Sequence, residues 1–115
     1  MNIELFRDEC LKKKSAEETF PFGEDTLVYK VMGKVFALTS FSEPDRCNLK
    51  CDPEKAIELR STYQSVKPGF HMNKQHWNTI HYNQDMNDRE ILELIEHSYQ
   101  LIVNSLPKKL RSQLQ

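Results

Sequence analysis

The stretch "TLVYKVMGKVFALTSF", residues 26–41, decides the fold of this chain. A Met-Gly pair divides the stretch into two halves. In each half, successive side chains alternate between two faces. One set consists of Leu27, Tyr29 and Val31 before the pair and of Val35, Ala37, Thr39 and Phe41 after it. Such alternation is typical of β-strands, and Gly33 can supply the positive φ that a tight two-residue turn requires. The stretch therefore predicts a β-hairpin.

Further strands are predicted beyond the hairpin, at residues 46–50, 65–67 and 77–82. In "RCNLK" (46–50), Cys47 and Leu49 would share one face of the strand. The opposite face would then carry Arg46, Asn48 and Lys50. Along residues 77–82 the same alternation places on one side Trp77, Thr79 and His81.

Three helices are predicted at residues 2–13, 52–63 and 87–106. Each has an apolar stripe or a clear start. Asp52 precedes a proline, which suits a helix N-cap, and Asn87 is followed three positions later by a glutamate in the manner of a capping box. The predicted order is α-β-β-β-α-β-β-α. This is an α+β two-layer sandwich, with helices on one face of a mainly antiparallel sheet.

"SAEETFPFGED", residues 15–25, is predicted to form a loop because turn-forming and charged residues dominate it. Phe20 and Phe22 flank Pro21 in this segment. We expect the two aromatic side chains to anchor the loop to the core.

Length and composition indicate one globular domain spanning residues 1–115. The chain is 38% hydrophobic and 29% charged, with a formal net charge of −1. No apolar run approaches the roughly 18 residues of a membrane span, and the start does not read as a secretory signal.

Three cysteines without a dense framework point to a reducing cytoplasm and leave a redox role for Cys10, Cys47 and Cys51 open. We expect a cytoplasmic monomer without a cofactor.

Three long segments lack acidic residues, and one of them is residues 97–115, where Lys108, Lys109 and Arg111 cluster. No Asp or Glu occurs in residues 26–42, which include Lys30 and Lys34, or in residues 59–84, which include Lys67 and Lys74. If these segments meet in space, the protein has one positive face despite its net charge. The alternative is that strands and loops simply contain fewer acids.

The second segment contains "KPGFHMNKQHWNTIHY", residues 67–82, with three of the four histidines. These histidines would lie on a turn and a strand, so their even spacing does not predict a metal site. The spacing of Cys47 and Cys51 is not diagnostic of a zinc site, and no sequence pattern of nucleophilic catalysis is present. We therefore expect neither a metal site nor catalytic residues.

Two binding hypotheses remain. In the first, cations and amides contact nucleic-acid phosphates, and the candidate residues are Lys30, Lys34, Lys67, His71, Asn73 and Lys74. The ordinary alternative makes Asn73 a turn cap and Trp77 a core residue. In the second, an aromatic cleft binds a small ligand or a protein partner, and the candidate residues are Phe22, Tyr29, Trp77 and Tyr99.

Several stretches resemble the YjbR/MmcQ-like family of small bacterial proteins. They are "FPFGEDTLVYKVMGKVFAL" (20–38), "LKCDPEKAIEL" (49–59), "HMNKQHWNTI" (71–80) and "SYQLIVNSLPKKLR" (98–111). The resemblance implies a frataxin-like α/β sandwich and binding of double-stranded DNA through wing-like hairpins. Iron binding as in frataxin would need an acidic ridge on the first helix, and here the acids of that helix are mixed with lysines.

Overall fold

The computed structural model describes residues 1–114. The helices are α1 (Ile3–Lys12), α2 (Pro53–Thr62), α3 (Asp88–Ser105) and α4 (Lys108–Ser112). The strands are β1 (Ala16–Thr19), β2 (Thr26–Val31), β3 (Lys34–Ser40), β4 (Arg46–Lys50), β5 (Val66–Pro68) and β6 (Trp77–His81). The predicted α+β sandwich is confirmed, and the structure adds β1 and the short α4 to the predicted order.

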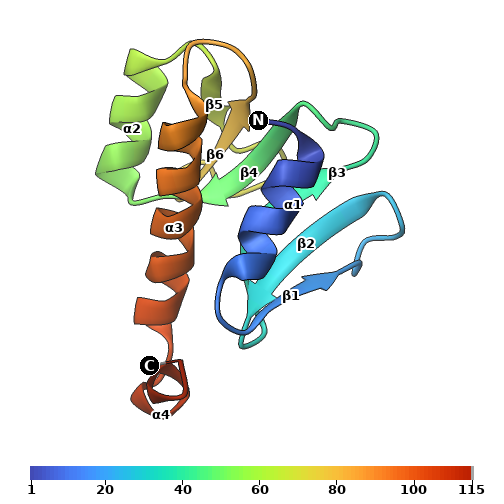
Figure 1. The fold of residues 1–115 in the computed structure, drawn as a ribbon. Coiled ribbons are helices and arrows are strands. Elements are labelled where there is room, and N and C mark those ends of the chain that lie inside the picture. The colour runs from blue at the N-terminus through green and yellow to red at the C-terminus, as the bar shows by residue number, and fades with distance from the viewer. Residues whose placement is uncertain (115) are drawn as a thin grey trace.

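The six strands form one antiparallel sheet in the order β1-β2-β3-β4-β6-β5. Helices α1, α2 and α3 pack against one face of this sheet (Figure 1). The main core lies between these helices and the sheet. We call the other face of the sheet, which carries none of these three helices, the open face.

The predicted helix starts are confirmed by side-chain caps. The Asp52 carboxylate accepts a hydrogen bond from the Lys55 amide, and the Asn87 side chain accepts one from the Glu90 amide. These caps satisfy amide groups that have no partner inside the helix.

The hairpin of β2 and β3 turns at Met32 and Gly33, as predicted, and both residues have positive φ. The pairing register shifts between Tyr29 and Lys30, which makes Phe36 an additional residue in β3. At this β-bulge, both Phe36 and Ala37 enter the main core. The strict alternation predicted for this strand is therefore wrong at Val35, which packs on the open face instead.

The bulge lies where β3 and β4 stop pairing, and a buried side chain of α3 joins them there. Direct pairing between these strands covers only Ala37 with Leu49 and Leu38 with Asn48. The Ser98 hydroxyl donates to the Phe36 carbonyl over 2.5 Å and accepts from the Lys50 amide over 3.0 Å. A helix side chain thus supplies the hydrogen bonds that the sheet itself lacks at this point.

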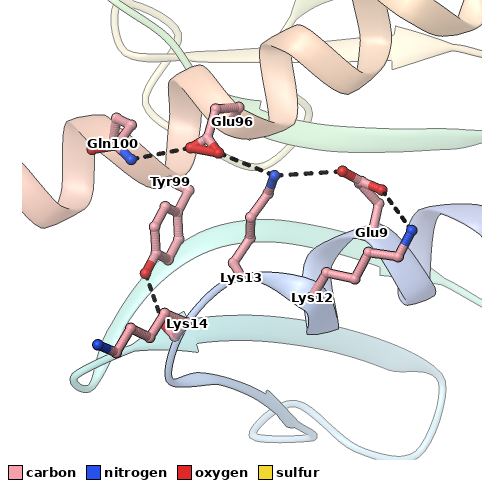
Figure 2. A network of polar contacts seen from close by, with 7 residues as sticks. All are labelled: Glu9, Lys12, Lys13, Lys14, Glu96, Tyr99 and Gln100. Carbon is pink, nitrogen blue, oxygen red and sulfur yellow. Dashed lines mark hydrogen bonds and ion pairs between the residues drawn. The ribbon is translucent and has the colours of Figure 1, made fainter. Parts of the chain in front are cut away.

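A second contact fastens α3 to the end of α1 (Figure 2). The Tyr99 hydroxyl donates to the Lys14 carbonyl over 2.6 Å. The Lys13 ammonium lies 3.4 Å from the Glu9 carboxylate and 3.2 Å from that of Glu96. The lysine run at the end of α1 therefore has a structural role, because it joins α1 to α3.

Residues 16–19, predicted as part of a loop, form the edge strand β1 instead. Glu18 holds this strand: its carboxylate accepts two hydrogen bonds from the Arg7 guanidinium and one from the Tyr29 hydroxyl. Burial raises the pKa of the Glu18 carboxyl, but the bonds from Arg7 and Tyr29 outweigh burial and hold that pKa below its usual range. The strand has little apolar alternation, so this polar contact adds to its backbone pairing with β2.

We expect Ser98→Ala to lower the free energy of unfolding by about 2–4 kcal/mol, because it leaves a buried carbonyl and a buried amide without a partner. The matched control is Ser105→Ala on the same helix, whose hydroxyl bonds only to the Ile102 carbonyl one turn earlier. Urea unfolding of both variants measures the difference. Equal losses in the two variants would contradict the bridging role of Ser98.

We expect Glu18→Gln to lower the free energy of unfolding by about 1–3 kcal/mol at neutral pH, since charge-assisted bonds are lost. The folded-state pKa of Glu18 is depressed, so its contribution is present above the unfolded value of about 4.3 and is lost as the pH falls through the folded-state pKa. The difference in free energy of unfolding between the variant and the parent protein should therefore disappear in acid. Glu17→Gln, on the other face of β1, is the control. A difference in free energy of unfolding that does not change with pH would argue against this role of the Glu18 carboxylate.

Candidate functional site

The open face has a small apolar cluster of its own, formed by Val28, Leu38 and Trp77. As predicted, Trp77 shares a side of its strand with Thr79 and His81. These three residues pair with the polar residues of β4, on the same face of the sheet. Its side chain is 9% exposed. Trp77 is therefore a packed residue, but it packs on the open face and not in the main core.

Residues 69–76, which we call the groove loop, rise over this cluster. The Gly69 amide donates to the Trp77 carbonyl over 2.8 Å. A Cβ at position 69 would lie 2.7 Å from the Cβ of Trp77, so only glycine allows the loop to approach β6 this closely.

Two of the predicted nucleic-acid-binding residues shape the groove loop. The Asn73 side chain accepts from the amides of Gln75 and His76, which confirms its role as a turn cap. The Lys74 ammonium donates to the Gly69 carbonyl over 2.9 Å. Both side chains are therefore engaged inside the loop.

The groove loop holds Phe70 beside β4. The Phe70 amide donates to the Thr79 hydroxyl over 2.9 Å, and its carbonyl accepts from the Asn48 side chain over 3.1 Å. The Arg46 guanidinium lies 4.8 Å from the centroid of the Phe70 ring, a cation–π geometry. A guanidinium is thus fixed above the open face next to an aromatic ring.

A groove of about 400 Å³ lies between the groove loop and the loop that precedes β2. It is lined by Phe22, Thr26, Leu38, Thr39, Ser40, Glu43, Arg46, Cys47, Asn48, Phe70, His71 and Met72. The expectation that Phe22 anchors its loop to the core is wrong, because this side chain is 74% exposed at the groove. Phe20 is also exposed.

The predicted aromatic cleft does not form as a unit. Tyr29 and Tyr99 lie in the main core on the helix-covered side of the sheet. Trp77 packs on the open face, and of the four candidates Phe22 alone lines the groove. The sheet separates the first two residues from the others.

Three strands place four cations on the open face: Lys30 on β2, Arg46 and Lys50 on β4, and Lys67 on β5. Within residues 1–114, the open-face positions of β2 to β6 carry no Asp or Glu. The nearest acids belong to the margins. Glu17 on β1 pairs with Lys30, and the Glu43 carboxylate lies 3.9 Å from the Arg46 guanidinium.

The structure separates Lys34 from the other predicted cations. Lys34 pairs with Val31, whose side chain belongs to the helix-covered core, whereas Lys30 pairs with Val35 of the open face. The two lysines of the hairpin therefore project toward opposite faces. His71 remains at the groove with an exposed side chain.

The predicted site residues did not include Arg46, Lys50 and Phe70. The first two could have been found from the sequence, because the alternation of "RCNLK" already places them together opposite the apolar side. Phe70 had no such signal, since its position depends on the hydrogen bonds of the groove loop with Asn48 and Thr79.

The described residues show no group of three or more His, Cys, Asp or Glu side chains arranged to hold a metal ion. All three cysteines are buried. Burial raises the pKa of the Cys47 thiol to about 12 and that of the Cys51 thiol to about 11, so both are protonated at neutral pH. No helix within residues 1–114 has the length and apolar character to cross a membrane.

Comparison with known proteins places this chain in a family. The chain is 37% identical to the uncharacterized protein YbdF of Escherichia coli O157:H7 over 87% of its length and 83% of that protein's. It is 33% identical to the uncharacterized protein YjbR of Escherichia coli K12, over 99% of the chain and 98% of that protein. The crystal structure of the Deinococcus radiodurans protein DR2400 has a TM-score of 0.90 at 37% identity, covering 97% of this chain and 86% of that one. The YjbR family model matches residues 11–101, and the chain belongs to this family.

Proposed function

We propose that the open face binds nucleic acid through its phosphates. Support comes from the cations that β2, β4 and β5 place on this face, at Lys30, Arg46, Lys50 and Lys67. Lysine and arginine side chains are the usual partners of phosphate oxygens. All four belong to one chain, so the proposal requires no second copy of the protein.

The distribution of acids favours the same face. The helices on the opposite side of the sheet carry most of the carboxylates, including Glu54 and Glu58 on α2 and Glu93 and Glu96 on α3. A polyanion would therefore meet the open face first, although the formal net charge is −1.

Four cations limit the strength of this binding. For duplex DNA, neutralising four phosphates gives a slope of log affinity against log salt of about −3 to −4, so the affinity falls steeply as salt rises. Phosphate contacts carry no base sequence information, and they form with a duplex or with a single strand.

We expect Lys30→Ala and Lys67→Ala to weaken binding to every oligonucleotide and to reduce the salt slope by about 1 each. Lys34→Ala is the matched control, because Lys34 lies on the same hairpin as Lys30 but projects to the other face. Fluorescence anisotropy of labelled oligonucleotides across a salt series measures both quantities. An equal effect of Lys34→Ala would assign binding to the hairpin tip, and the absence of binding at low salt would end the proposal.

A second candidate is a small-ligand site in the groove. Its volume of about 400 Å³ suits a small molecule, and Arg46 at its wall favours an anion. The two candidate functions differ in how many residues the ligand contacts. A small anion would contact the groove residues alone and would bind equally well to Lys67→Ala, whereas a nucleic-acid strand would not.

A further inference from the structure

We propose that the groove accepts one unpaired base, and that the protein therefore binds single-stranded nucleic acid in preference to a duplex. This inference rests on the proposed binding of nucleic acid by the open face. It adds a feature that phosphate contacts alone do not supply, namely a concave aromatic site between the cations.

The shape of the groove is the first argument. Phe22 stands on one side, and the groove loop with Phe70 and Met72 stands on the other, above a floor that includes Leu38. Paired bases in a duplex are stacked inside the helix and cannot enter a hollow of this size. An unpaired base can be turned outward and stacked on an aromatic side chain.

The exposure of Phe22 is the second argument. An aromatic ring with 74% of its surface exposed contributes little to folding, and it lies on the lip of the groove. Phe70 is already covered on one side by the Arg46 guanidinium. Phe22 is therefore the available stacking surface, and Arg46 is the available partner for the phosphate or for the plane of the base.

Polar groups in the groove can contact the edge of a base. The Ser40 hydroxyl accepts from the Glu43 amide over 3.2 Å, so its own proton is available to a ligand. The Glu43 carboxylate is a hydrogen-bond acceptor, which suits the exocyclic amino group of a base such as cytosine. The negative charge of this carboxylate would repel a bare phosphate from the part of the groove that Glu43 lines.

In the order of the strands across the sheet, cations flank the groove on both sides. The groove rests on β3 and β4, between Lys30 on β2 and Lys67 on β5. Four strand spacings separate β2 from β5, a distance of about 19 Å. Several nucleotides of an extended single strand cover this distance, so phosphates on both sides of the bound base can reach a lysine.

The test uses the full chain with Phe22→Ala and, as matched control, Phe41→Ala. Phe41 is also exposed, at 47%, but its ring lies 5.6 Å from Arg7 of α1, away from the groove. We measure the affinity of each protein for a single strand of mixed sequence and for the corresponding duplex at one salt concentration. Thermal unfolding verifies that both variants remain folded.

We expect the parent protein to bind the single strand at least about tenfold more tightly than the duplex. Phe22→Ala should weaken single-strand binding by roughly tenfold and leave duplex binding unchanged, because loss of one base–aromatic stack has an effect of this order. Phe41→Ala should change neither.

Equal affinities for strand and duplex, or no effect of Phe22→Ala, would overturn the base-binding inference. If Lys30→Ala and Lys67→Ala still weakened binding in that case, the phosphate-binding proposal would stand. A protein that binds neither form at low salt would remove both proposals.

Discussion

The fold depends on one buried hydroxyl group. Ser98 completes the sheet where the bulge at Phe36 ends the pairing of β3 with β4, and its neighbours on α3 hold two other parts of the chain. His97 accepts a hydrogen bond from the Asp52 amide at the start of α2. Burial, with a smaller effect of nearby Lys55, lowers the pKa of His97 and favours the neutral imidazole that can accept this bond. Tyr99 reaches the end of α1. Three consecutive residues of one helix therefore fix the position of the sheet and of two helices.

This arrangement determines which surface is available for binding. Because α1, α2 and α3 all pack on one face, the sheet must protect the apolar residues of its other face with loops. The groove loop covers Trp77, and its close approach at Gly69 leaves a hollow over β3 and β4. The hollow and the cations around it thus lie on the face that the helices leave uncovered, and the carboxylates of α2 and α3 lie on the opposite side.

Local patterns predicted much of the fold, and pairing between strands explains what they missed. The caps at Asp52 and Asn87 and the turn at Gly33 depend on a few neighbouring residues, so the sequence reveals them. The bulge at Phe36 and the edge strand held by Glu18 depend on side chains of other elements, since Ser98 of α3 bonds to the Phe36 carbonyl and Arg7 of α1 bonds to Glu18. The site shows the same contrast: the predicted two-residue turn pairs Val31 with Lys34 and so already sends Lys30 and Lys34 to opposite faces, but the strict alternation assumed for this strand concealed it. Phe22 was misjudged because its exposure depends on where its loop passes.

We propose that the open face, and not the helix-covered side, meets nucleic acid. A titration of the ¹⁵N-labelled protein with a short single strand at low salt, followed by amide chemical shifts in NMR spectra, tests this most directly. We expect the shifted amides to cluster in the loop around Phe22, along β4, in residues 69–76 and near Lys30 and Lys67. Shifts that cluster on the outer surfaces of α2 and α3, or spectra that do not change, would contradict it.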